Sequence, residues 1–233
     1  MTESIGEDNI ITSASNIKVN PADNNTWVVT YDKQGESVSL TANHVVTTCG
    51  AYSLPSVLPF VDESTMASLS NLYYAPVIQI GVGLRNCNGH QWKAFGALVP
   101  SLEKKDVLGI LFPSAFFVGR SPEEGATFAY FIGGARHPEY LQKSDEELID
   151  IVNKGLTDML KYPVGTQADS IRIFRHERAI PQYEESSDAR FEAIRKVQEQ
   201  YPTLTIAGNL RDGIGMGDRI KQAFDVAEDI AGK

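Results

Sequence analysis

The amino-acid sequence predicts a mixed fold of class α+β or α/β, in which short strands alternate with a few amphipathic helices. Three observations support this class. The first 50 residues are rich in β-branched and aromatic residues separated by turn residues, and the middle of the chain alternates strand patterns with helix patterns. Residues 204–231 run from an apolar stretch through several glycines into an amphipathic helix.

Composition limits the classes of function. The chain has 233 residues, enough for one or two domains, and its 42% hydrophobic and 22% charged residues are ordinary for a globular protein. A net charge of −9 without clustered Lys and Arg argues against nucleic-acid binding. No apolar run approaches the roughly 20 residues of a spanning helix, and the N-terminus lacks a signal-peptide layout, so we expect a soluble, intracellular protein. Cys49 and Cys87 favour free buried thiols over a disulfide or a metal site.

The first part of the chain is predicted to form a small antiparallel meander. Its strand patterns lie at residues 17–19, 27–31 and 37–40, with turn residues between them. A short buried strand is expected at residues 44–48, where it ends at Cys49-Gly50.

The middle of the chain combines strands with two longer helices. Strand patterns lie at residues 77–84, 94–99, 107–112, 126–132 and 171–174, and a shorter helix is expected to open at residues 62–65. The clearest helix begins with a capping box, in which Ser144 is the N-cap and Glu147 reaches back to it. A further helix contains residues 191–197. The loop at residues 114–124 carries Phe116, Phe117 and Arg120.

The C-terminal glycine stretch is the strongest indication of a ligand. Gly213, Gly215 and Gly217 alternate with other residues, and Asp218 stands where an N-cap is expected. The helix start offers unpaired N–H groups and the positive end of the helix dipole, which fit the anionic or electron-rich edge of a cofactor. The alternative is a tight turn whose glycines only satisfy backbone angles. The dinucleotide fingerprint Gly-x-Gly-x-x-Gly occurs nowhere in the sequence, so any nucleotide site within this chain is incomplete.

Hydrolytic and metal chemistry are not indicated. The four histidines are scattered, and none stands at metal-ligand spacing with another His, Cys or carboxylate. No Gly-x-Ser-x-Gly occurs. We therefore expect no metal site and no hydrolytic nucleophile.

Several segments, taken together and in order, resemble flavin-dependent protoporphyrinogen oxidases, a branch of the flavin amine oxidase superfamily. The resemblance covers nearly the whole chain but only the C-terminal part of the family, because the N-terminal Gly-x-Gly-x-x-Gly unit is missing. The end of the chain, Ala207-Gly208-Asn209 and then Gly213-Ile214-Gly215-Met216-Gly217-Asp218, is similar to the family's AGNxxxGVGxxD. The other segments that carry the resemblance are residues 27–31, 42–52, 94–101, 108–112, 116–120, 132–134 and 179–183.

The resemblance implies a domain organisation and a set of site residues. It implies a mixed-sheet substrate-binding domain at residues 53–202 and an incomplete, Rossmann-like FAD-binding domain made from residues 1–52 and 203–233, whose strands near Val45 and Leu204 meet. Two departures from the family pattern are Val118, where Pro is usual, and Arg219, where Cys is common. The implied residues are Asn16, Ile17, Gly213, Ile214, Gly215, Met216 and Gly217 for FAD, and Leu98 and Phe117 for the tetrapyrrole.

The resemblance also implies an activity. A complete enzyme of this kind uses FAD and molecular oxygen to remove six electrons from protoporphyrinogen IX or coproporphyrinogen III in haem biosynthesis. No residue of this chain is implied as a catalytic acid or base. Another flavin amine oxidase activity and a non-catalytic isolated fragment remain open as alternatives, since we expect the chain alone to be inactive and to hold little or no FAD. We expect a cytoplasmic location, and the resemblance leaves open attachment to the inner face of the membrane and a homo-oligomer.

Overall fold

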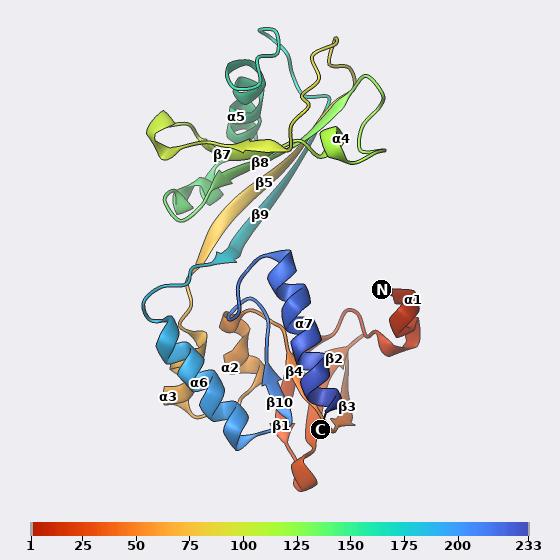
Figure 1. Cartoon of the computed structure of the whole chain (residues 1–233), viewed down its shortest axis with the longest axis vertical. Helices are drawn as coiled ribbons and strands as arrows, with labels where there is room; N and C mark the ends of the chain where they lie inside the picture. Colours follow the sequence, from red (N-terminus) through yellow and green to blue (C-terminus); the bar gives the residue numbers. More distant parts are fainter. Residues whose placement is uncertain (1, 233) are drawn as a thin grey trace. The chain divides into compact units, whose positions relative to one another are not determined.

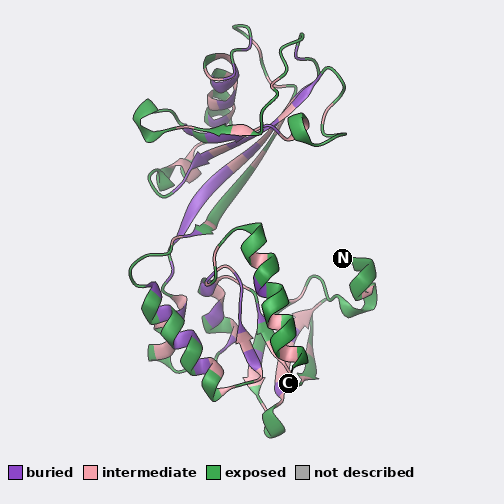
Figure 2. Cartoon of the chain, viewed as in Figure 1, coloured by how far each residue is buried: buried purple, intermediate pink, exposed green. Residues whose placement is uncertain are grey.

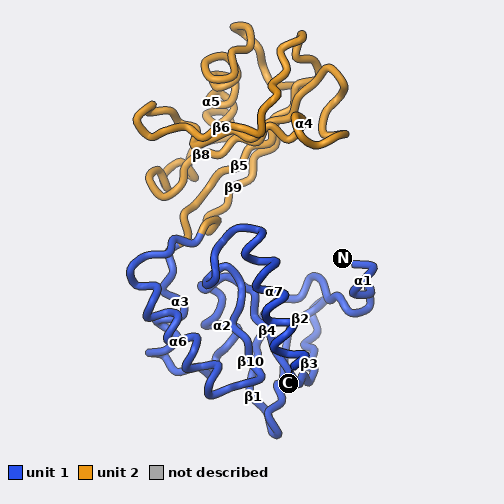
Figure 3. Tube along the Cα trace, viewed as in Figure 1, with its two compact units in different colours: residues 1–73, 181–233 blue, residues 74–180 orange. Residues whose placement is uncertain are grey.

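The computed structural model describes residues 2–232 and divides into two compact units, shown in two colours in Figure 3. The first unit combines both ends of the chain, residues 1–73 and 181–233. The second consists of residues 74–180. Strands and helices alternate in both units (Figure 1), which confirms the predicted mixed class.

The first unit holds two small sheets. Strands β1 (Ser15–Pro21), β2 (Trp27–Lys33) and β3 (Glu36–Ala42) form the predicted antiparallel meander. Strands β4 (Val45–Thr47) and β10 (Leu204–Ile206) pair in parallel, with Leu204 opposite Val45, so the expected meeting of these two strands is confirmed. The helices of this unit are α1 (Thr2–Ile5), α2 (Leu54–Val57), α3 (Glu63–Ser70), α6 (Ser187–Gln200) and α7 (Met216–Ala231), with short 3-10 turns at Glu7–Asn9, Asp23–Asn25 and Ala51–Ser53.

An aromatic cluster explains why helices α2, α3 and α6 belong to the unit of the chain ends. The buried Trp27 ring lies 5.5 Å from the Phe60 ring and 5.6 Å from the Tyr201 ring, and its indole N–H donates to the Thr203 hydroxyl at 2.9 Å. These contacts join the meander to the chain before α3 and after α6. The compact second unit is therefore smaller than the segment 53–202 that the sequence assigns to a substrate domain, and the unit boundaries lie at 73/74 and 180/181.

The second unit is built on one five-stranded sheet with the strand order β6-β7-β8-β5-β9. One strand differs clearly from its prediction: β9 is much longer than the expected residues 171–174, although most of its residues are exposed (Figure 2). The elements are β5 (Tyr74–Leu84), β6 (Gly96–Leu98), β7 (Val107–Leu111), α4 (Pro113–Phe116), β8 (Ala126–Gly133), α5 (Asp145–Asp158) and β9 (Ser170–Pro181), with 3-10 turns at Ser101–Glu103 and Pro138–Gln142.

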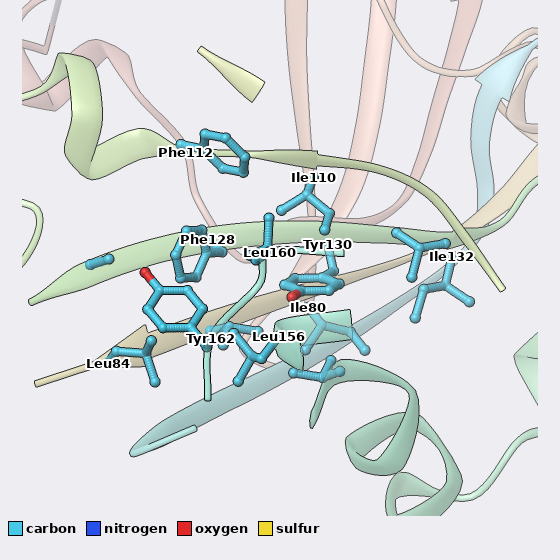
Figure 4. Close-up of a cluster of buried hydrophobic side chains, with 14 of the residues drawn as sticks. Ile80, Leu84, Ile110, Phe112, Phe128, Tyr130, Ile132, Leu156, Leu160 and Tyr162 are labelled. Carbon is cyan, nitrogen blue, oxygen red and sulfur yellow. The ribbon is translucent and has the colours of Figure 1, made fainter. Parts of the chain in front are cut away.

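The core of the second unit lies between one face of this sheet and helix α5. Alternate residues of the strands, such as Ile80, Ile110 and Tyr130, point to this face (Figure 4), and Leu148 and Leu156 of α5 pack against them. The predicted capping box of α5 is confirmed, because the Ser144 hydroxyl accepts from the Glu147 N–H and the Glu147 carboxylate accepts from the Ser144 N–H. The other described α-helix of this unit, the short α4, lies beside β8, where the Ser114 hydroxyl accepts from the Thr127 N–H at 2.9 Å.

Candidate functional site

The glycine turn lies at the carboxyl edge of the parallel strand pair. It follows β10 and leads into α7, and Thr48 at the end of β4 lies beside it. Gly208 has φ 102°, and a Cβ there would stand 3.0 Å from the Thr48 carbonyl oxygen, so only glycine allows the two strand ends to approach this closely. Ligands of open α/β sheets bind at this edge, outside the carboxyl ends of the strands.

Helix α7 begins three residues earlier than the sequence predicts. Gly215, not Asp218, is the N-cap, and Asp218 occupies the third helical position, from which its carboxylate accepts from the Gly215 N–H at 2.9 Å. The left-handed φ of 94° at Gly213 turns the chain early enough for the helix to start at Met216. Asp218 thus stabilises the helix start as expected for an acidic residue, but from inside the first turn.

Two side chains of α7 hold the glycine turn. The buried Gln222 accepts from the Gly208 N–H at 2.9 Å and donates to the Asp212 carboxylate at 2.7 Å. The Arg219 guanidinium donates to the carbonyls of Gly208 and Arg211. Arg219, noted from the sequence only as a departure from the family pattern, therefore fixes the shape of the turn.

A third side chain, from the segment that follows β9, also holds the turn. The Tyr183 hydroxyl lies 3.0 Å from the Asn209 carbonyl oxygen and 3.1 Å from the Gly213 carbonyl oxygen, and it donates to them. Burial raises the pKa of the Tyr183 phenol, which keeps this donor protonated. The segment 179–183, which carries part of the family resemblance, thus contributes a hydrogen bond that positions the turn.

The start of α7 leaves room and donors for a ligand. The first N–H groups of the helix, at Met216 and Gly217, have no partner within a helix of this kind. A Cβ at Gly217 would meet no atom within 4 Å, and the side chains of Ile214 and Met216 are 51% and 80% exposed. Five of the predicted cofactor residues, Gly213 to Gly217, therefore form one exposed surface with backbone donors, which fits an electron-rich edge of a flavin.

The other two predicted cofactor residues lie on the meander. Asn16 has a left-handed φ of 51°, and its amide donates to the Asp32 carboxylate at 2.7 Å across the bulge between β1 and β2. Ile17 is 42% exposed. No hydrogen bond among the described residues joins these two positions to the glycine turn, and their role in FAD binding stays a prediction.

An apolar groove runs along α7 beside the turn. It has a volume of about 530 Å³. Thr48 and Gly208 line it at the strand ends, and Ala223, Ala227 and Ile230 line it along the helix. Other apolar side chains of α7 are also open to solvent, since Ile220 is 54% and Phe224 67% exposed. Helix α7 thus presents a face that no described residue covers.

In the second unit, the sheet face opposite α5 forms an open surface, which we call the open face. The strand registers align its residues in two rows across the sheet. The first row consists of small residues except for Leu111, and in the second row a glycine separates two apolar side chains. The rows are Gly96, Leu111, Ala129 and Gly81, and then Leu98, Gly109, Phe131 and Gln79.

The predicted substrate residue Leu98 lies on the open face. Its side chain is 87% exposed, and a Cβ at Gly109 would stand 3.1 Å from its Cδ2 atom, so Leu98 leans over that glycine. This exposure excludes Leu98 from the core of the second unit.

Phe117 lies near the end of the same sheet edge. Its ring is 55% exposed and 4.7 Å from the Phe116 ring, which stacks on Phe95 at 4.6 Å, and Phe95 precedes the first residue of β6. The Arg120 guanidinium lies 5.6 Å from the centre of the Phe117 ring. Phe117 is therefore part of an exposed aromatic cluster, and its contact with a substrate stays a prediction.

Sequence reasoning missed two residues of the open face, Leu111 and Phe131. Both belong to predicted strands, and both alternate with core residues, since Ile110 and Tyr130 point toward α5. The alternation was available in the sequence. It could not tell which of the two faces a helix covers.

The described residues contain neither a metal site nor a membrane span. No three His, Cys, Asp or Glu side chains gather into a possible ligand cluster within residues 2–232. None of the described helices combines the length and apolar character that crossing a bilayer requires. Both cysteines are free, with Cys87 buried and Cys49 only partly so.

Comparison with known proteins gives the family. Residues 1–231 match the family of flavin containing amine oxidoreductases. The chloroplastic protoporphyrinogen oxidase of Nicotiana tabacum is 26% identical over 214 residues, which are 88% of this chain and 39% of that protein. Protoporphyrinogen oxidase 2 of Arabidopsis thaliana is 34% identical over 139 residues, which are 58% of this chain and 27% of that protein. The structure of reduced UDP-galactopyranose mutase matches 99% of this chain and 50% of its own with a TM-score of 0.80 and 13% identity, a likeness of fold.

The chain therefore spans well under half the length of these curated relatives. The resemblance to protoporphyrinogen oxidases seen in the sequence is confirmed, and the family description implies a flavin in complete enzymes. The match extends over nearly every residue of both units. This chain belongs to the family of flavin containing amine oxidoreductases.

Proposed function

We propose that this chain is part of an FAD-dependent porphyrinogen oxidase. In this proposal, the open face of the second unit binds the tetrapyrrole, and the glycine turn of the first unit binds one edge of the flavin. The observation that carries the proposal is the open face, where exposed apolar side chains border small residues in a chain similar to protoporphyrinogen oxidases.

The open face suits a large, flat, apolar ligand. The middle of the face carries small residues, which are Gly81, Ala129 and Gly109. The larger side chains of Leu98 and Phe131 project from the same face. Burying an exposed leucine under a ring removes apolar surface from water, which gains about 25 cal/mol per Å². A macrocycle can cover several such side chains at once, whereas a small amine would cover only one or two.

The glycine turn suits the flavin. When bound, the flavin would supply the hydride acceptor of the oxidation. The residues of this chain would bind and orient it: Met216 and Gly217 through backbone N–H groups, with the positive end of the α7 dipole favouring negative charge nearby. Gln222 and Tyr183 would keep those donors in place through their hydrogen bonds to the turn. We assign no catalytic acid or base to this chain.

The complete reaction in this proposal is the six-electron oxidation of protoporphyrinogen IX or coproporphyrinogen III by molecular oxygen. We further propose that the chain alone is inactive and binds FAD weakly, because it lacks the Gly-x-Gly-x-x-Gly turn that contacts a dinucleotide pyrophosphate. Isolation of the chain as a yellow protein with one FAD per polypeptide would contradict the proposal of weak binding.

The substrate proposal is tested by titrating the purified chain with protoporphyrin IX, the stable oxidised product, and following the porphyrin fluorescence. We expect saturable binding that excess cyclohexylamine does not compete away. Leu98→Glu places a charge on the open face and should weaken binding at least tenfold. Leu102→Glu is the matched control, since Leu102 is 90% exposed but lies in the 3-10 turn after β6.

Two results would overturn the proposal. Absence of saturable porphyrin binding would remove the tetrapyrrole as a ligand of this chain. Equal affinities of the Leu98→Glu and Leu102→Glu variants would show that porphyrin binds elsewhere than on the open face. Because both leucines are almost fully exposed, neither change should impair folding, which circular dichroism would check.

A further inference from the structure

Arg172 lies at the end of one row of the open face. A Cβ on Gly81 would stand 3.9 Å from the Arg172 Cβ atom, so Arg172 extends the row of Leu111, Ala129 and Gly81 onto the edge strand β9. The side chain is exposed. No described residue forms a hydrogen bond or an ion pair with its guanidinium.

The neighbouring Arg175 shows what a paired arginine of the same strand looks like. Arg175 lies on the opposite face and donates to the Lys143 carbonyl at 2.7 Å, and it pairs with the Asp145 carboxylate at 2.7 Å near the start of α5. Arg175 therefore has a structural role in the second unit. Arg172 has no comparable partner, and no packing requirement explains a guanidinium at its position.

The open face offers Arg172 no carboxylate. The strand residues that face this side are glycines, alanine, apolar residues and uncharged polar residues, together with His176 and Arg178 farther along β9, and none of them is a carboxylate. The flanking face positions on β9 are Ser170 and Phe174, and a Cβ on Gly83 would lie 3.5 Å from the Ser170 Cβ atom. A lone guanidinium beside apolar surface favours an anionic ligand group, and its planar donor pair matches a carboxylate.

The dimensions of the sheet fix where that carboxylate must be. Leu111 and Arg172 are separated by three strand-to-strand steps of about 4.8 Å each, which is about 14 Å across the sheet. Between them lie only Ala129 and Gly81. A flat ligand held by Leu98 and Leu111 at one edge would cover these small residues and reach Arg172 with an acidic side chain at its other edge.

We propose that Arg172 binds a carboxylate of the ligand on the open face and thereby fixes the orientation of the macrocycle. This inference rests on the proposed function and adds a determinant of specificity to it. The ligand class becomes a tetrapyrrole with free carboxylic acid side chains. Esters of the same ring lack the charge that pairs with the guanidinium, and they bind less tightly.

The experiment compares two porphyrins that differ only in this charge. The full chain is titrated with protoporphyrin IX and with its dimethyl ester in the same buffer, using the unmodified protein, Arg172→Gln, Arg172→Lys and the control Arg136→Gln. Arg136 is an exposed arginine in the turn after β8, outside the sheet. Circular dichroism confirms that each variant is folded.

We expect Arg172→Gln to weaken binding of the free acid about tenfold and to leave binding of the ester unchanged. Arg172→Lys should restore part of the loss, and Arg136→Gln should have no effect. Equal affinities of the unmodified chain and Arg172→Gln for the free acid would overturn the assignment of Arg172 while the proposed function stands. Equal losses for Arg136→Gln and Arg172→Gln would overturn it as well, because the effect would then be unspecific. Failure of the unmodified chain to bind either porphyrin would overturn both the proposed function and this inference.

Discussion

Two buried tyrosines in the core of the second unit should respond oppositely to loss of their hydroxyl groups. The Tyr130 side chain is fully buried, and its hydroxyl has no hydrogen-bond partner among the described residues. The Tyr162 hydroxyl, in the same core, donates to the His90 carbonyl at 2.9 Å. Phenylalanine replaces either residue with nearly the same shape, so the change isolates the hydroxyl.

The expected magnitudes follow from these partners. Burying a hydroxyl without a hydrogen-bond partner costs about 1–3 kcal/mol of desolvation free energy. Removing the hydroxyl recovers this free energy, but it also removes a few dispersion contacts that stabilise by about 0.1–0.2 kcal/mol each. Tyr130→Phe should therefore raise the free energy of unfolding by about 0.5–2 kcal/mol. Tyr162→Phe loses the hydrogen bond to the His90 carbonyl, so it should lower the free energy of unfolding by about 0.5–1.5 kcal/mol.

Urea unfolding of both variants, followed by circular dichroism, measures the two changes. Because the chain has two units, hydrogen exchange of peptides from β8 and α5 should be recorded to assign the effect to the second unit. A Tyr130→Phe protein less stable than the unmodified chain by more than about 0.5 kcal/mol would refute the reasoning. It would mean that the Tyr130 hydroxyl has a partner, such as a buried water molecule.

Three further predictions concern other parts of the chain. Hydrogen bonds from the start of α3 lower the pKa of Asp62 to about 2, below the value of about 3.9 expected in the unfolded chain, so its stabilising effect is present above pH 4 and is lost as the pH falls toward 2. The difference in melting temperature between the unmodified chain and Asp62→Asn should shrink over that range, and a constant difference would contradict it. Gly217→Ala should stabilise the chain by up to about 1 kcal/mol because its space is open and its backbone is helical, whereas Gly213→Ala, at φ 94°, should destabilise it by more than that in the same thermal assay. Phe117→Ala should lower the free energy of unfolding by less than about 1 kcal/mol because the ring is 55% exposed, whereas Phe128→Ala, where the ring is buried, should lower it by about 3–5 kcal/mol. Equal losses in urea unfolding would show that Phe117 is a core residue.

The sequence predicted correctly the helices and strands that depend on residues close together in the chain. The capping box at Ser144 was visible because both of its hydrogen bonds join residues three apart. The β5 strand was visible because it is an apolar run in an interior strand of the sheet, between β8 and β9. Most of β9 was not, because an edge strand with an exposed face can carry charged residues such as Arg172 and Arg178 and then lacks the usual alternation.

Contacts between distant residues account for the other differences. Helices α2, α3 and α6 join the unit of the chain ends through the packing of Trp27 with Phe60 and Tyr201, the last of which is 174 residues away from Trp27 along the chain. The hydrophobic periodicity of one segment gives no information about which distant segment it contacts. The same limit applies to Phe131, whose strand was predicted correctly while the choice of the open face depends on where α5 packs.

The two parts of the candidate site differ in how their function can be altered by substitution. At the glycine turn the groups offered to a ligand are backbone N–H groups, which no substitution removes without changing the chain itself. Side chains affect these N–H groups only by holding the turn in place. Substitutions of Gln222 or Tyr183, which form hydrogen bonds to the turn, would therefore change the positions of the N–H groups. On the open face, the proposed ligand would contact side chains directly. Leu98 and Arg172 are exposed, so they can be changed with little effect on folding. Variants of the open face can therefore separate ligand binding from stability, whereas variants of the turn change both together.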